Sequence, residues 1–306
     1  MTGESRLMSD TGEEWQVARR RKGAARKSKP LQVSSNSTCC EDQLDIAKTV
    51  KRIRETVSDL RCEEFWPQWK KQLLVALGSV ELSKSPVDRD PEAPTEDGQL
   101  FQNLDCVCYG LGSFSSCVSA RFQLAMLLLL LDAGQIPLKD CFIYDPAFSS
   151  GEREVLMQLG LTVLTDNEEG KRLATKPTLF YLMHCGKALY NNLLWKNWST
   201  QSLPLMIIIG NSFNGILERT IEREFKRDYI YITQAVSVCE DRLLPCPSRL
   251  IDVFSDTAVI TFPTSSLNRL PQSTWVEPPE PQYQHCPDLE IIQRETQERD
   301  RGGTIN

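Results

Sequence analysis

The chain has 306 residues, of which 41% are hydrophobic and 25% charged, and its net charge at pH 7 is −6. This composition predicts a globular protein with one large or two small domains. The negative charge argues against general nucleic-acid binding, because contacts to phosphates need a basic face. The longest apolar run, at residues 124–131, is shorter than the roughly 20 residues of a bilayer span, so no membrane segment is expected.

Cysteine is frequent, but its pattern does not predict a disulfide scaffold. The chain contains 11 cysteines, an odd number in a large chain. Cys106, Cys108 and Cys141 lie in apolar runs, where buried and reduced thiols are typical. The sequence has no C-x-x-C motif and only 2 histidines, which gives little support to a zinc site. The pattern therefore indicates a reducing compartment.

Residues 1–40 are polar and lack periodicity, with a basic run at 18–30. A solvated, disordered basic arm is the simpler interpretation, and a nuclear-localisation or nucleic-acid patch is the alternative. The first residues carry no apolar stretch of the kind that a secretory signal needs, so secretion is not expected.

Residues 41–78 are predicted to form a helical extension. One apolar stripe recurs at steps of three and four, at Ile46, Val50, Ile53, Val57 and Leu60. Asp42 is the expected N-cap, and Pro67 is expected to interrupt the helix. Docking on the main domain is the simpler role for this extension, and partner binding is the alternative. The proline-rich, acidic residues 79–99 predict a linker.

Residues 100–263 alternate between apolar strand-like runs and helical stretches. The expected strands lie at 104–110, 140–146, 161–165, 178–185, 204–212 and 258–262. The expected helices lie at 116–133, 151–159, 189–198 and 215–226. Several strand runs are apolar at nearly every position, as in parallel sheets that are covered on both faces. The sequence therefore predicts an α/β fold with a doubly wound, mostly parallel Rossmann-like sheet, followed by a disordered Pro-rich and charged tail at 264–306.

In such a sheet, ligands bind at the carboxyl ends of the strands, so the residues after each strand are the candidate site. Gly110, Gly112, Ser113 and Ser115 follow the first strand. Glycines permit a sharp turn, and the helix that follows offers N–H groups to an anion. Ser115 stands where the full phosphate-binding fingerprint has a third glycine. A nucleotide-like ligand and a purely structural turn therefore both remain open.

Three further candidates end the next strands. Asp145 is placed to hold a ribose hydroxyl, with a turn or cap residue as the alternative. Asn167 follows the third strand and is polar at the same edge. His184 can act as a base or as a metal or haem ligand, with a structural histidine as the alternative.

Tyr190, Asn191, Asn211 and Ser212 follow the later strands. These residues form good hydrogen bonds but have little acid–base ability, so the set favours a binding pocket over a reaction centre. No catalytic residue is assigned.

Two Cys-Pro dipeptides stand outside the apolar strands, at Cys246 and Cys286. A thiolate before proline can be presented to haem from a flexible segment, because proline keeps that segment out of a helix. We list both thiols as candidate haem ligands, with chance occurrence as the alternative.

The core motifs resemble those of the Sensitivity-to-Red-Light-Reduced (SRR-like) family. The resemblance is carried by CYGLGSFSSC (108–117), ARFQLAMLLLLL (120–131), YDPAFSSGE (144–152), LTDNEEGK (164–171), PTLFYLMHC (177–185), YNNLLWKNW (190–198) and IIIGNSF (207–213). EWQVARRRKG (14–23) also looks like the vertebrate members. One departure is the absence of a proline before His184.

The resemblance implies a mostly cytoplasmic protein that regulates haem biosynthesis and circadian clock gene expression, and it supplies no reaction. Three hypotheses follow. The first is a regulatory protein that binds haem or another small ligand at the carboxyl edge of the sheet. The second is a Rossmann-type enzyme, a methyl transferase or a nucleotide-dependent activity, that uses Asp145. The third is a scaffold that recruits protein partners.

Overall fold

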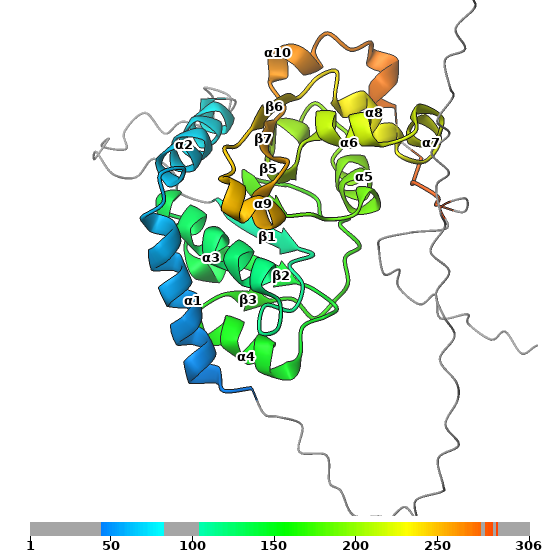
Figure 1. Cartoon of the computed structure of the whole chain (residues 1–306). Helices are drawn as coiled ribbons and strands as arrows, with labels where there is room; N and C mark the ends of the chain where they lie inside the picture. Colours follow the sequence, from blue (N-terminus) through cyan, green and yellow to red (C-terminus); the bar gives the residue numbers. More distant parts are fainter. Residues whose placement is uncertain (1–43, 83–103, 277–278, 284–285, 287–306) are drawn as a thin grey trace, which may run out of the picture. The chain divides into compact units, whose positions relative to one another are not determined.

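A seven-stranded sheet lies between two layers of helices (Figure 1). The computed structural model describes residues 44–82, 104–276, 279–283 and 286. The strands are β1 (Asp105–Tyr109), β2 (Cys141–Tyr144), β3 (Thr162–Val163), β4 (Thr178–Leu182), β5 (Met206–Asn211), β6 (Glu240–Leu243) and β7 (Thr257–Thr261). The fold is therefore α/β, as the alternation of apolar runs predicts.

The sheet is mixed, with the order β3-β2-β1-β4-β5-β7-β6. The first five strands in this order are parallel to one another. β7 is antiparallel to both β5 and β6. The expectation of a mostly parallel sheet is thus corrected at this edge. The connection from β6 to β7 contains only the short helix α9 (Ile251–Phe254) and a 3-10 turn, whereas parallel neighbours usually need a longer helical crossover.

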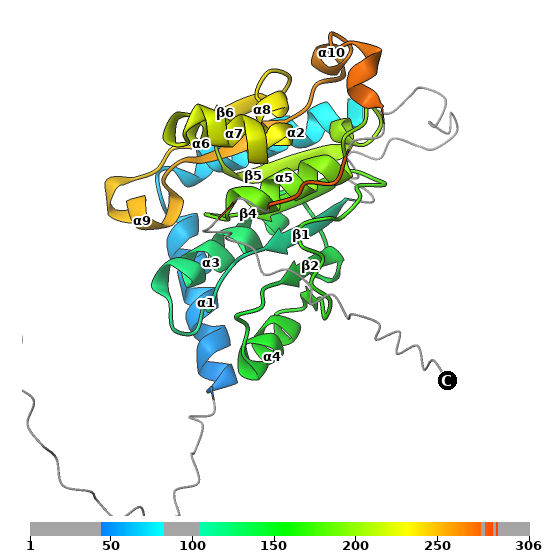
Figure 2. The same ribbon diagram turned by 90° about the vertical axis from the view of Figure 1, so that its right-hand side faces the viewer.

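Both faces of the central strands are buried, which explains why these strands are apolar at nearly every position. Successive residues of β1 point to opposite faces: Cys106 and Cys108 enter one hydrophobic cluster, the first core, and Val107 and Tyr109 enter the other, the second core. β4 is buried along its whole length in the same way. In Figure 2 the layer that contains α5, α7 and α8 faces the viewer.

The helices divide between these two cores. The first core is covered by α1 (Ile46–Arg61), α2 (Trp66–Leu82), α3 (Val118–Ala133), α4 (Ser150–Gln158) and α9. The second core is covered by α5 (Lys187–Lys196), α6 (Phe213–Arg219), α7 (Glu222–Asp228), α8 (Ile230–Ala235) and α10 (Thr264–Leu267). Among the helices of the described ranges, none has the length and hydropathy of a membrane span.

The N-terminal helices dock on the first core through the predicted apolar stripe, which buries Val50, Ile53 and Leu60. The N-cap of α1 is Asp45, whose side chain accepts a hydrogen bond from the Lys48 N–H at 2.9 Å. Pro67 lies in the first turn of α2, where its missing N–H costs no helical hydrogen bond. The expected N-cap Asp42 lies outside the described residues.

Three regions that the sequence predicts lie wholly or partly outside the described residues. The basic arm at 1–40 and most of the linker at 79–99 lie outside them. So do residues 287–306 of the expected tail. Within 264–286, the structure describes α10, a 3-10 turn at Gln272–Trp275 and a short segment that packs on the second core.

Candidate functional site

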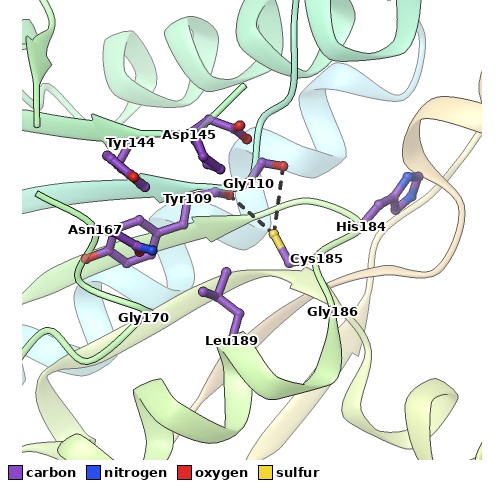
Figure 3. Close-up of a pocket in the computed structure, with 11 residues that line it drawn as sticks. Tyr109, Gly110, Tyr144, Asp145, Asn167, Gly170, His184, Cys185, Gly186 and Leu189 are labelled. Carbon is purple, nitrogen blue, oxygen red and sulfur yellow. Dashed lines mark hydrogen bonds between the residues drawn. The ribbon is translucent and has the colours of Figure 1, made fainter. Parts of the chain in front are cut away.

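The carboxyl ends of β1 and β4 lie side by side, because these strands are parallel neighbours with Cys108 opposite Tyr181. The chain leaves β1 toward α3 on the first core and leaves β4 toward α5 on the second core. Such a divergence is the switch point at which open α/β sheets bind ligands. A cavity of about 340 Å³ lies there (Figure 3), within the size range of small-molecule sites.

Eleven residues from the ends of β1, β2 and β4, the loop after β3 and the start of α5 line this cavity. They are Tyr109, Gly110, Tyr144, Asp145, Pro146, Asn167, Gly170, His184, Cys185, Gly186 and Leu189. The structure thus brings together four of the candidates proposed from the sequence, Gly110, Asp145, Asn167 and His184. Asn167 accepts a hydrogen bond from the Glu169 N–H at 3.0 Å through its side-chain oxygen.

Gly110 is the residue at which the two strand ends touch. Its φ is +67°, a left-handed conformation that glycine adopts without steric cost. A Cβ at this position would lie 2.5 Å from the Cys185 Sγ. The Cys185 thiol in turn donates to the Tyr109 carbonyl at 3.3 Å (Figure 3). The glycine is therefore required for the close approach of the two segments, whatever ligand the cavity holds.

The loop after β1 is occupied by carboxylates of the protein itself. The Gly112 N–H donates to Asp145 Oδ2 at 2.8 Å, and the Ala147 N–H donates to Asp145 Oδ1 at 2.7 Å. The Ser115 N–H donates to Glu152 Oε1 at 2.9 Å. These amides are the groups that an anionic ligand would need. The loop is thus folded around internal anions, and Gly112 and Ser115 do not line the cavity.

Glu152 is 1% exposed and belongs to the capping box of α4, together with Ser149. Ser113 also donates to Glu152 through its hydroxyl, at 2.8 Å. Burial acts to raise the pKa of Glu152, but the hydrogen bonds from Ser115, Ser149 and Ser113 outweigh burial and lower the pKa below its usual value. The charged carboxylate is therefore the form that holds this loop.

Tyr109 links the cavity to an ion pair. Its hydroxyl donates to Glu168, which also accepts from Arg172 at 3.0 Å. Burial and the hydrogen bond to Glu168 raise the pKa of Tyr109 well above its usual value, so the phenol stays protonated and donates. The Arg172 guanidinium lies 4.7 Å from the Phe142 ring centroid. These contacts order one wall of the cavity.

His184 borders the cavity, but its imidazole points away from Cys185 (Figure 3). The side chain is exposed, and its Nε2 lies 3.2 Å from the Ser255 carbonyl oxygen. Its φ of +52° is left-handed, which is uncommon for a residue other than glycine. This geometry matches a turn residue that leads the chain out of β4, and it places no imidazole nitrogen toward the cavity.

Tyr190, Asn191, Asn211 and Ser212 stabilise the fold around the rim and do not line the cavity. The Tyr190 hydroxyl accepts from the Asn211 N–H at 2.8 Å, and Asn191 Oδ1 accepts from a backbone N–H of α8 at 3.0 Å. Ser212 caps α6 through the Gly215 N–H at 3.0 Å. Ser113, the remaining candidate, points to Glu152 as described above.

Cys246 and Cys286 lie on opposite faces of the sheet. Cys246 packs against the first core and Cys286 against the second. The Cys246 thiol donates to the Leu250 carbonyl at 3.5 Å, and the Cys286 Sγ lies 3.7 Å from the Tyr229 hydroxyl. Their separation excludes a single haem held by both thiols. Within the described part of the chain, no group of three or more His, Cys, Asp and Glu side chains is placed to hold a metal ion.

Most of the apolar lining was not among the candidates from the sequence, including Tyr109, Tyr144 and Leu189. The two tyrosines end neighbouring strands and are opposite each other in the β1–β2 register. Aromatic residues in apolar strands give no separate signal for a cavity, because core residues share that pattern. Cys185 and Gly186 were within reach of the sequence, since Cys185 ends the expected strand at 178–185 and Gly186 follows it.

The fold and the cavity define an α/β protein with a candidate small-ligand site at the switch point of a mixed sheet. The SRR1 domain model matches residues 95–261 of the chain. This match covers more than half of the sequence, so the chain belongs to the SRR1 domain family.

Three relatives extend this result. The chain is 42% identical to a mouse SRR1-like protein over 71% of its own length and 90% of the relative. It is 29% identical to a fruit-fly SRR1-like protein over 85% of its own length and 86% of the relative. It is 41% identical to the Arabidopsis protein SENSITIVITY TO RED LIGHT REDUCED 1 over 36% of its own length and 40% of the relative. No solved structure matches the chain.

Proposed function

We propose that this chain is a regulatory protein that binds a small ligand in the cavity between β1 and β4. Through that ligand it acts in the control of haem biosynthesis and circadian gene expression, and the proposed location is the cytoplasm. The cavity at the switch point is the observation that carries the ligand-binding part. Family membership supports the regulatory part.

The lining favours a ligand that contains a ring and is smaller than haem. Tyr109, Tyr144 and Leu189 supply apolar surface, and aromatic side chains pack well against flat rings. The residues present fit haem poorly. Cys185 donates to the Tyr109 carbonyl, the His184 imidazole points away from the cavity, and Cys246 and Cys286 lie on opposite faces.

One observation favours an enzyme as the second candidate. The order β3-β2-β1-β4-β5 is that of the first five strands of the classic dinucleotide-binding fold. Against it, the Gly112 and Ser115 amides that would hold a phosphate already bind Asp145 and Glu152. Stabilisation of the protein by adenosyl methionine or by a nicotinamide cofactor in a thermal-shift measurement would favour the enzyme.

The test is to purify the full chain from a native source and to identify the small molecules that denaturation releases by mass spectrometry. The variant Leu189→Trp fills the cavity, so it should lose the bound molecule. Met157→Trp is the matched control, because Met157 is exposed on α4 and does not line the cavity. Equal recovery of one molecule from both variants, or none from the wild type, would contradict the proposal. A hemin titration of the same three proteins tests haem directly, and an equal Soret shift in all three would place haem outside the cavity.

A further inference from the structure

The described segment Pro279–Tyr283, here called the C-terminal strap, packs against α5 (Figure 2). Tyr283 is 9% exposed and belongs to the second core. The Tyr231 hydroxyl donates to the Pro279 carbonyl at 2.7 Å. The strap is thus held at both of its ends, although it follows a Pro-rich and polar stretch of sequence in which no element is expected.

The Tyr283 hydroxyl lies among buried polar groups of α5. It accepts from Asn191 Nδ2 at 3.1 Å and donates to Asn192 Oδ1 at 2.7 Å. The Ala188 carbonyl oxygen lies 3.2 Å from the same hydroxyl. Asn191 and Asn192 are 0% and 2% exposed. Removing the hydroxyl would take a hydrogen-bond partner from each of these two buried amides. The loss of hydrogen bonds to buried polar groups lowers the free energy of unfolding.

Asn192 connects the strap to the wall of the cavity. Its Nδ2 donates to the Glu169 carbonyl at 2.8 Å. The next residue, Gly170, lines the cavity and packs so closely on α5 that a Cβ there would lie 2.8 Å from the Leu189 carbonyl oxygen. A continuous chain of contacts therefore runs from Tyr283 through Asn192 to Gly170.

An ion triad forms a second connection between the strap and the same wall. Lys171 Nζ lies 2.7 Å from a carboxylate oxygen of Glu169 and 2.7 Å from one of Glu280. Partial burial acts to lower the pKa of Lys171, and the two carboxylates outweigh burial and raise it. Lys171 is therefore charged at neutral pH and holds Glu280 of the strap beside the loop that carries Gly170.

We propose that the C-terminal strap is a latch for the ligand site and that Tyr283 is a positioning residue, which holds the Glu169–Gly170 wall and the start of α5 in place. Release of the strap loosens this wall. Docking of the strap and filling of the cavity therefore favour each other, because coupling between two sites is reciprocal. Only the reference to a ligand rests on the proposed function, since the strap orders the wall whether or not the cavity is filled.

The test uses the full chain without ligand and measures the wall directly. Cys185 lines the cavity and is half-buried, and Cys62 and Cys117 are exposed. We expect Tyr283→Phe to raise the rate of N-ethylmaleimide labelling of Cys185 about tenfold, the effect of losing one or two buried hydrogen bonds, and to leave Cys62 and Cys117 unchanged. Hydrogen exchange should rise at residues 167–172 and 186–190 and stay unchanged at 110–117.

Tyr181→Phe is the matched control, because Tyr181 is a fully buried phenol that donates to the Gln123 carbonyl at 2.8 Å in the first core. It should not change the labelling of Cys185. The milder variant Glu280→Gln keeps the fold and should give a smaller rise in Cys185 labelling, with Glu222→Gln, from the exposed pair with Lys226 on α7, as its control.

The proposal is overturned if hydrogen exchange shows the strap released while Cys185 labelling and exchange at 167–172 equal those of the wild type. It is also overturned if Tyr181→Phe has the same effect as Tyr283→Phe, since the change would then be global. Because no ligand enters the measurement, failure to find a bound molecule contradicts the proposed function and leaves the strap result unaffected.

Discussion

The segments after β1 and after β4 occupy equivalent places in the sheet but differ in what their polar groups bind. Each segment follows one of two parallel neighbouring strands, and each leads into a helix. After β1, the Gly112 and Ser115 amides bind the carboxylates of Asp145 and Glu152. After β4, Gly186 is the N-cap of α5 and forms no side-chain cap hydrogen bond, and the segment lines the cavity.

This difference separates a loop that serves the fold from a segment that is open to a ligand. A glycine-rich turn before a helix attracts anions whatever their source. In the β1 loop, α4 supplies the anion from its own capping box. The cavity therefore lies beside the glycine-rich loop after β1, which has the stronger sequence motif. The segment after β4 has the weaker motif but supplies more of the lining.

The largest expected effect comes from removing the internal anion of the β1 loop. Glu152→Ala leaves the hydrogen-bond donors of Ser113, Ser115 and Ser149 without their acceptor. Hydrogen bonds to a buried charge contribute about 1.5–3 kcal/mol each, so we expect the free energy of unfolding to fall by about 3 kcal/mol or more. Urea denaturation measures this change.

Glu154→Ala is the control for this prediction, because Glu154 is exposed on the same helix. Its effect should stay within about 0.5 kcal/mol. A loss for Glu152→Ala no larger than that would show that the β1 loop does not depend on its internal carboxylate, and the contrast between the two segments would disappear.

The second effect lies where the two segments touch. Gly110→Ala adds a Cβ at 2.5 Å from the Cys185 Sγ and forces alanine into a φ of +67°. We expect a loss of about 2 kcal/mol in the free energy of unfolding. Gly112→Ala should cost less, because its added Cβ would meet nothing closer than 3.9 Å and only the φ of +77° opposes it.

A double variant separates the two causes at Gly110. Cys185→Ala removes the clashing sulfur, so Gly110→Ala combined with Cys185→Ala should recover part of the stability that Gly110→Ala loses. Strictly additive losses in urea denaturation would show that the approach of the two strand ends is not what requires glycine here.

The sequence predicts the fold well where both faces of the sheet are covered. Runs such as those at β4 and β5 are apolar at nearly every position and buried on both faces of the sheet, a pattern typical of a doubly covered strand. The direction of β7 has no such signal, because an apolar run of five residues is the same in either direction. β6 was missed because it is exposed and charged, as edge strands often are.

The candidate site was predictable in its position but not in its lining. The strand ends located Gly110 and Asp145, which line the cavity. The sequence could not show that the Gly112 amide is bound by Asp145, since that contact joins residues 33 positions apart. Nor could it show that Tyr283, in a Pro-rich stretch, completes the hydrogen bonding of Asn191 and Asn192.

Acid should weaken the β1 loop. The pKa of Glu152 is lowered in the folded protein, so its stabilisation is fully present above the unfolded-state value of about 4.3 and is lost as the pH falls through the folded-state pKa. The stability difference between wild type and Glu152→Gln should therefore shrink below about pH 4.3. Urea denaturation from pH 3 to 7 measures this change. A difference that grows in acid would reverse the sign argued here.

The smallest expected effect concerns His184, which borders the cavity without pointing into it. Asparagine tolerates the left-handed φ of +52°, so His184→Asn loses only the contacts of the two ring nitrogens, Nε2 with the Ser255 carbonyl and Nδ1 with Gln123 Nε2 at 3.5 Å. We expect a change within about 0.5 kcal/mol in the free energy of unfolding and unchanged N-ethylmaleimide labelling of Cys185. His184→Val should cost more, because a β-branched residue is strained at this φ. If His184→Asn abolished recovery of the bound molecule while its stability equalled that of the wild type, the imidazole would be a ligand contact, and the segment after β4 would contribute a second side chain beside Cys185.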